Sequence, residues 1–261
     1  MNALLRRNGC KSKLADVIIS HFPKHTSYAE PFFGTGSIFF RKPKAKFNFL
    51  NDKDSDVSNL FWCVMNHKDE LEEKFRIMPI HQDLLEYWKK NKETEPILKA
   101  LRFIFLSNFT YLGKMDCLRF QLSNPKKQFL KALDFTHKKL ENCYFNNCDF
   151  ERFFISVSLK KNSEVEGCFA YLDPPYLDTG NNYSKEEGCH NWTEQDVISL
   201  LDTVQKTGVK FAYSEFDHPF LINQAKERNL TVIWLGERKN LKNRRTEILI
   251  INYDVSQMKL F

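Results

Sequence analysis

The sequence lacks the cysteine spacing of a zinc site or a disulfide framework. It has no Cys-x-x-Cys pair, and its seven cysteines are an odd number. No apolar run is long enough to cross a membrane, and the first residues lack the apolar core of a signal peptide. We therefore expect a cytoplasmic protein with reduced thiols and no metal site.

Repeats and low-complexity linkers are also missing, as are Ser/His/Asp and Cys/His arrangements typical of nucleophilic catalysis. What is present is a hydrophobic content of 42%, enough for a core, and a formal net charge of +6. Residues 1–48 hold nine Lys or Arg and two acids, and residues 238–245 form a second basic cluster. This excess fits a polyanionic partner, although charge runs are also common on solvated surfaces.

The spacing of apolar residues predicts an α/β fold. A short helix at 13–21 precedes a strand at 28–33, a glycine turn, a helix opening at 37–40 and a second strand at 47–50. Further strands are expected at 143–147, 168–172, 210–213, 231–235 and 247–253, with helices at 193–206 and 218–228. The last two strands have no helix between them, which predicts an antiparallel hairpin at the end of the sheet.

Residues 56–140 have a different pattern, because helical periodicity at 57–66, 68–75, 82–90 and 96–108 is not interrupted by any strand. Consecutive strands of a parallel sheet are not usually separated by so many residues, so we expect a mostly helical insertion. The predicted sheet domain then comprises residues 1–55 and 141–261, and residues 111–125 form a loop or hairpin of the insertion.

The most specific motif is Asp173-Pro174-Pro175-Tyr176, which follows the apolar strand at 168–172. Ligands of open α/β sheets bind beyond the carboxyl ends of the strands. Pro175 favours an extended Pro174, whose carbonyl can then project as an acceptor beside the Asp173 carboxylate.

Two such acceptors suit an exocyclic amino group, whose lone pair is otherwise delocalised into its ring. They can draw the nitrogen toward a tetrahedral geometry and offset its developing positive charge. Tyr176 offers a flat face on which an extruded base can stack. The alternative is structural, with Pro174 and Pro175 ending a strand and Tyr176 covering the core.

A glycine turn and a later acid predict the cofactor. Gly34 and Gly36 let the backbone pass close to a ligand, but the third glycine of Gly-x-Gly-x-x-Gly is replaced by Phe39. Asp52, at the end of the next strand, can bind both hydroxyls of a ribose. A plain turn and a helix-capping acid would also explain these residues. Together they favour a nucleoside cofactor such as S-adenosylmethionine over a dinucleotide.

These motifs resemble the Dam-type family of DNA adenine-N6 methyltransferases, in the family's order and over most of the chain. The resemblance implies a Rossmann-like class I methyltransferase sheet with an inserted, mostly helical target-recognition domain at 56–140. Cys10 departs from the Gly-Gly-Lys segment of relatives. The implied cofactor contacts are Arg7, Gly9, Lys11, Pro31, Phe33, Gly34, Thr35, Gly36, Ser37, Asp52, Asp149, Phe150 and Asp173.

The resemblance also places residues 108–119 on the DNA. Arg119 is the candidate for a base contact, because a guanidinium binds guanine bidentately, although a phosphate contact or a salt bridge is an alternative. Lys114 and Lys126 are candidates for phosphate contacts, and Tyr111 can wedge into DNA or pack in the core. The Pro-Phe-Gly of GATC-methylating relatives is absent, so the target sequence stays open.

The sequence thus predicts an enzyme that flips an adenine out of duplex DNA and methylates N6 directly, without a covalent intermediate or a metal. Alternatives are the same chemistry on RNA, on cytosine N4 or on protein glutamine, and a DNA-binding relative without activity. A nicotinamide-dependent oxidoreductase is a further alternative, which the missing third glycine disfavours. A bacterial or phage monomer is the simplest expectation, with a restriction endonuclease as a possible partner in a restriction-modification system.

Overall fold

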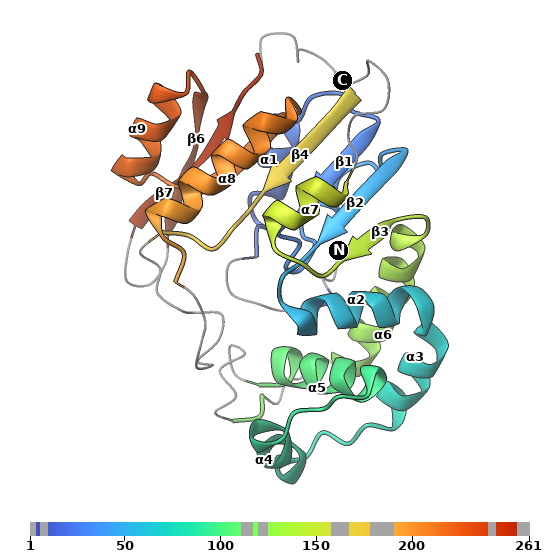
Figure 1. Ribbon diagram of the computed structural model, residues 1–261. Helices are drawn as coiled ribbons and strands as arrows, with labels where there is room; N and C mark the ends of the chain where they lie inside the picture. Colours follow the sequence, from blue (N-terminus) through green and yellow to red (C-terminus); the bar gives the residue numbers. More distant parts are fainter. Residues whose placement is uncertain are drawn as a thin grey trace.

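The computed structural model describes residues 4, 5, 10–110, 117–119, 125–157, 167–177, 191–239 and 244–254. Within them lies a seven-stranded sheet of order β3-β2-β1-β4-β5-β7-β6 (Figure 1). The first five strands of that order are parallel, and β7 is antiparallel to both β5 and β6. The strands are β1 Ser27–Glu30, β2 Phe47–Asn51, β3 Tyr144–Asn146, β4 Cys168–Leu172, β5 Lys210–Phe216, β6 Thr231–Lys239 and β7 Arg244–Ile251. The predicted α/β class and the terminal antiparallel pair are confirmed.

The strand order reverses between β1 and β4, which are adjacent in the sheet but separated by more than 130 residues. The chain moves outward from β1 through β2 to β3, and then crosses back to β4 and continues in the other direction. Such a reversal opens a crevice at the carboxyl ends of the two central strands. The glycine turn follows β1 and the Asp-Pro-Pro-Tyr motif follows β4, so both predicted motifs lie at the carboxyl ends of these two adjacent strands.

Strand β4 is buried on both faces, and its side chains alternate between two cores. Phe169 and Tyr171 belong to the core on the face of α1 Ala15–Ser20, whereas Cys168, Ala170 and Leu172 belong to the other. That second core is covered by α7 Phe150–Ser156 and α8 Glu194–Thr207, which lie in front of the sheet in Figure 1. The helix α9 Pro219–Glu227 packs beside α8.

The helices of the predicted insertion gather below the sheet in Figure 1. Their hydrophobic side chains are continuous with the first core, because Phe61 of α2 packs edge-on against Phe33 at 4.8 Å and stacks near Phe145 at 5.6 Å. No helix within the described ranges has the length and apolarity needed to span a membrane. The helices are α2 Ser55–Asn66, α3 Lys68–Ile77, α4 Gln82–Lys90, α5 Pro96–Asn108 and α6 Pro125–Leu140.

The helix predicted to open at residues 37–40 is wrong. This segment forms consecutive tight turns, in which the backbone N–H groups of Arg41 and Lys42 both bond to the carbonyl of Ile38. Phe39 and Phe40 turn inward and lie 5.9 and 5.7 Å from the ring of Phe33. Burying both aromatic rings on one side in this way outweighs the local preference for a helix.

Candidate active site

Asp173 begins the segment that leaves the carboxyl end of β4. Its side chain is 21% exposed, Pro174 is buried and Pro175 is exposed. Among the described residues, none donates a hydrogen bond to the Pro174 carbonyl. The Asp173 carboxylate therefore lies at the carboxyl end of β4, and the Pro174 carbonyl as the second acceptor stays a prediction.

Lys11 is the partner of Asp173. Its side chain is only 3% exposed, and Nζ donates to Oδ1 of Asp173 at 2.6 Å. The backbone N–H of Lys11 also bonds to Ser37 Oγ at 3.2 Å, which ties the N-terminal segment to the glycine turn. Burial raises the pKa of Asp173 above its usual range, and the Lys11 ammonium opposes this rise.

Tyr176 lies inward, with only 8% of the residue exposed. Its ring packs edge-on against Phe216 at 4.8 Å, the Lys11 ammonium lies 4.3 Å from its centroid, and its hydroxyl donates to Glu247 Oε1. The ring is therefore enclosed in the absence of DNA. Stacking of a base on Tyr176 remains a prediction, which requires the ring to become more exposed.

The glycine turn is shaped for close approach of a ligand. Gly34 and Gly36 have φ of +53° and +66°, and the N–H of Gly34 bonds to Asp52 Oδ2 at 2.6 Å. A Cβ on Gly36 would lie 2.4 Å from a ring carbon of Phe40, whereas a Cβ on Gly34 would meet nothing within 4 Å. The Gly34 side of the turn is thus open, and the Asp52 carboxylate lies directly beside it.

Three partly exposed aromatic rings gather on the α7 side of this turn. Phe32 lies 5.9 Å from Phe150 and 5.7 Å from Trp192, and Phe150 lies 6.0 Å from Trp192. Phe150 was predicted from the sequence, but Phe32 and Trp192 were missed. Phe33, which was predicted as a cofactor contact, instead buries its ring in the core. Successive side chains after a strand point to opposite sides, and this alternation could have indicated that Phe32, not Phe33, faces the turn.

Asp149, which the resemblance assigns to the cofactor, caps α7 by accepting a hydrogen bond from Arg152 N at 2.8 Å. Pro31 is buried, and its carbonyl accepts from the side chain of Asn51 at 2.9 Å. The Thr35 hydroxyl donates to Cys10 Sγ at 3.5 Å. Lys11, Ser37 and the glycine turn are therefore brought together, whereas the predicted residues Arg7 and Gly9 lie outside the described ranges.

Buried acids surround Asp173. Burial raises the pKa of Glu30 to about 8 and that of Glu215 to about 9. Glu30 accepts from the Tyr28 hydroxyl at 2.8 Å, and Glu215 accepts from Leu177 N at 3.3 Å. The sequence prediction included neither acid in the site, although a glutamate is almost never fully buried unless it is paired, as both are here.

The comparison with known proteins decides the family. Residues 8–247 match the model of the D12 class N6 adenine-specific DNA methyltransferase family. The chain belongs to this family.

Individual methyltransferases are similar at lower identity. The chain is 25% identical to the modification methylase StsI of Streptococcus sanguinis, over 97% of this chain and 43% of that protein. It is 28% identical to the DNA adenine methylase of Escherichia coli (strain K12), over 67% of this chain and 64% of that protein. The type II methyltransferase M1.LlaDCHI of Lactococcus lactis subsp. cremoris is 23% identical over 88% of this chain and 87% of its own length. The chain thus spans less than two thirds of the first two relatives.

One solved structure, an rRNA methyltransferase from Streptomyces viridochromogenes, aligns with 95% of this chain and 88% of its own. Its TM-score of 0.41 and identity of 14% are too low to bear on fold or function.

The DNA-contact residues that the family resemblance implies are only partly described. Tyr111 and Lys114 lie outside the described ranges, and Arg119 is exposed. Lys126 donates to the backbone carbonyls of Arg76 and Met78, and so satisfies the end of α3; burial lowers its pKa. An ammonium carries three N–H donors, so Lys126 can keep both carbonyls and still contact a phosphate.

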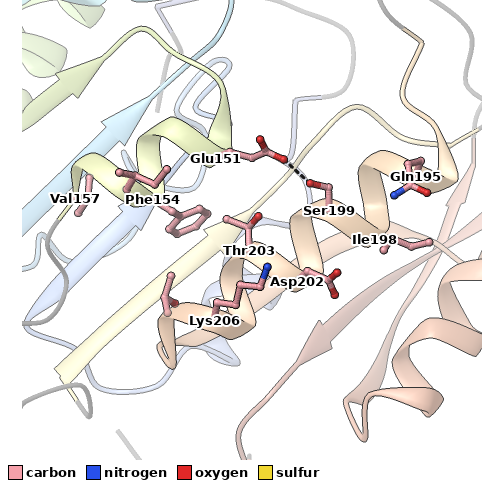
Figure 2. A pocket seen from close by; sticks show the side chains of 11 residues that line it. Glu151, Phe154, Val157, Gln195, Ile198, Ser199, Asp202, Thr203 and Lys206 are labelled. Atoms are coloured by element: carbon pink, nitrogen blue, oxygen red, sulfur yellow. Dashed lines mark hydrogen bonds between the residues drawn. The ribbon is translucent and has the colours of Figure 1, made fainter.

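A hollow of about 710 Å³ lies between α7 and α8, away from the methyltransferase motifs. Figure 2 shows Glu151 and Ser199 pointing toward each other there, joined by a hydrogen bond. No residue of the Asp173–Tyr176 motif or the glycine turn lines it. In the part of the chain that the structure describes, no cluster of three or more His, Cys, Asp or Glu could hold a metal ion.

Proposed function

We propose that the chain transfers the methyl group of S-adenosylmethionine to N6 of an adenine in DNA. The observation that carries this proposal is the position of the Asp173 carboxylate. It is held by Lys11 at the carboxyl end of β4, next in sequence to Pro174, and the glycine turn follows the adjacent strand β1. Membership of the family supports the reaction type.

The residues around the glycine turn fit the cofactor. Asp52 would accept hydrogen bonds from the ribose hydroxyls, and the open side of Gly34 would let the backbone touch the ligand. The rings of Phe32, Phe150 and Trp192 would pack against the adenine of the cofactor. When bound, S-adenosylmethionine supplies an electrophilic methyl group on a sulfonium.

The residues of the protein accept hydrogen bonds from the target amine and position it for the transfer. Asp173 and the Pro174 carbonyl accept the two N–H groups of the target amine, which localises its lone pair toward the methyl group. Lys11 opposes the effect of burial, so that Asp173 can carry the negative charge that offsets the positive charge on N6. The proton that N6 loses after the transfer can pass to Asp173.

Residues 56–140 would act as the target-recognition domain, and residues 1–55 and 141–261 as the catalytic domain. In this proposal Arg119 contacts a base, Tyr111 wedges into the DNA, and Lys114 and Lys126 meet phosphates. Tyr176 stacks on the flipped adenine. Relatives named as modification methylases and as DNA adenine methylases both match, so a restriction endonuclease as partner is one possibility and a solitary enzyme another.

The test is methyl transfer from labelled S-adenosylmethionine to unmethylated duplex DNA, followed by nucleoside mass spectrometry. RNA and protein substrates are compared in the same assay. N6-methyladenine in DNA supports the proposal, whereas N4-methylcytosine, or label only in RNA or protein, refutes it and identifies the correct alternative.

A further inference from the structure

Glu247 is a fully buried acid in the first half of β7, and it contacts two residues of the candidate active site. One of its oxygens, Oε1, accepts the hydroxyl of Tyr176 and also lies 3.4 Å from Lys11 Nζ. Glu247 therefore joins the tyrosine of the catalytic motif to the lysine that holds Asp173.

The position of this carboxylate is fixed by the sheet. Glu247 pairs with Phe216 across the antiparallel strands β5 and β7, and the Phe216 ring packs edge-on against Tyr176 at 4.8 Å. The same tyrosine ring contacts Lys11, whose ammonium lies 4.3 Å from the ring centroid. The pairing of β5 with β7 thus brings both the Glu247 carboxylate and the Phe216 ring to Tyr176.

We propose that Glu247 is a positioning residue for methyl transfer. It holds Tyr176 through the hydroxyl and keeps the Lys11 ammonium beside Asp173, and it does not touch the substrate itself. The inference rests on the proposed function and assigns its site one more residue. A glutamate with only a structural role would affect stability, but it would not change the pH dependence of the chemical step.

The charges around Asp173 make that distinction measurable. The Glu247 carboxylate raises the pKa of Asp173 and the Lys11 ammonium lowers it, although burial is the largest cause of the shift. The other titratable groups coupled to Asp173 through the sheet and the motif are Tyr28, Glu30, Tyr171, Tyr176, Tyr213 and Glu215. Removing the charge at 247 should therefore let Asp173 ionise at lower pH.

The experiment compares Glu247→Gln with the wild type in steady-state methylation of duplex DNA across pH, with a thermal melt for each. The account predicts that kcat falls about tenfold, because the Tyr176 hydroxyl keeps only a neutral acceptor and Lys11 loses the negative charge at 3.4 Å. It also predicts that the acid limb of kcat/KM moves down by roughly one pH unit. Glu227→Gln, an exposed charge-matched change on α9, should leave both quantities as in the wild type.

A second variant tests the same contact from the side of the tyrosine. Tyr176→Phe keeps the ring and removes only its hydroxyl, so its loss in kcat should overlap with that of Glu247→Gln in the double variant. Fully additive losses, or an unchanged acid limb in Glu247→Gln, overturn the inference while leaving the proposed function intact. A folded wild-type chain that does not methylate DNA overturns both.

Discussion

The ammonium of Lys11 donates a hydrogen bond of 2.6 Å to Oδ1 of Asp173, across 162 residues of sequence. This pair connects the segment before α1 to the end of β4, and it places a cation beside the acid that the proposed reaction needs. Because both side chains are largely withdrawn from water, their interaction is screened less than a surface ion pair.

Lys11→Met should lower kcat/KM ten- to hundredfold at neutral pH, because a hydrogen bond between charged groups is lost. Burial raises the pKa of Asp173 and Lys11 opposes the rise, so without Lys11 the pKa climbs further. The acid limb of the pH profile must then move to higher pH, opposite to the shift expected for Glu247→Gln. Lys13→Met, at an exposed neighbouring position, is the matched control. A profile unmoved by Lys11→Met would show that Asp173 does not depend on this lysine.

The two glycines of the turn should respond differently to alanine. Both have positive φ, so each substitution should cost about 1–2 kcal/mol of folding stability. Gly36→Ala would also press a Cβ against the rings of Phe33 and Phe40, which adds about 1–3 kcal/mol. Gly34→Ala meets no protein atom but fills the open side of the turn, so it should weaken cofactor binding. Urea unfolding and calorimetric titration with the cofactor measure the two effects, and equal stability losses would contradict the described packing.

Glu215 should make stability depend on pH. Its pKa is raised from 4.5 to about 9 in the folded chain, so the folded state holds a proton that the unfolded state releases. Its contribution to stability is complete below pH 4.5 and is lost as the pH rises toward 9. Glu215→Gln removes this dependence, and the neutral amide can still accept from Leu177 N.

The free energy of unfolding of Glu215→Gln, relative to the wild type, should therefore rise between pH 6 and pH 8, by at most about 1.4 kcal/mol per pH unit. Urea unfolding at the two pH values measures this difference. A constant difference would mean that Glu215 is already ionised in the folded protein at pH 6.

Lys126 and Arg119 should separate stability from DNA binding. Lys126→Met leaves the carbonyls of Arg76 and Met78 without their donor, which should cost about 1–3 kcal/mol of stability. Arg119→Ala, at an exposed position, should leave stability nearly unchanged and weaken binding to duplex DNA. Melting temperature and fluorescence anisotropy with labelled DNA distinguish the two. In the proposed function Lys126 also contacts a phosphate, so Lys126→Met should weaken DNA binding as well as stability. Unchanged stability would contradict the two bonds to the end of α3.

The parts of the fold set by local pattern were predictable. The bounds of β4, α4 and α5 agree with the apolar periodicity, because a fully apolar strand and amphipathic helices each bury a regular set of side chains. Thr193, the first residue of the helix predicted at 193–206, is the N-cap of α8 and forms a complete capping box with Asp196. The position of each motif at a strand end also followed from the α/β pattern, whereas the adjacency of β1 and β4 is known only from the structure.

The parts set by tertiary packing were not predictable. Residues 37–40 would suit a helix locally, but the rings of Phe39 and Phe40 are drawn into the core by Phe33. The helices α6 and α7 were not predicted individually, and β5 and β6 extend beyond their predicted ends. Glu247 stands at the start of an apolar run, and only the pairing of β5 with β7 brings it to Tyr176.

The central claim depends on the negative charge of Asp173. Asp173→Asn keeps the size of the side chain and one acceptor but removes that charge, and it should leave the aromatic rings and Asp52 in place. The most direct measurement is the single-turnover rate of N6-adenine methylation for wild type and Asp173→Asn, with cofactor bound to both. The account predicts a rate lower by about 10²- to 10³-fold in the variant, with little change in cofactor affinity. A variant that methylates adenine as fast as the wild type would contradict it.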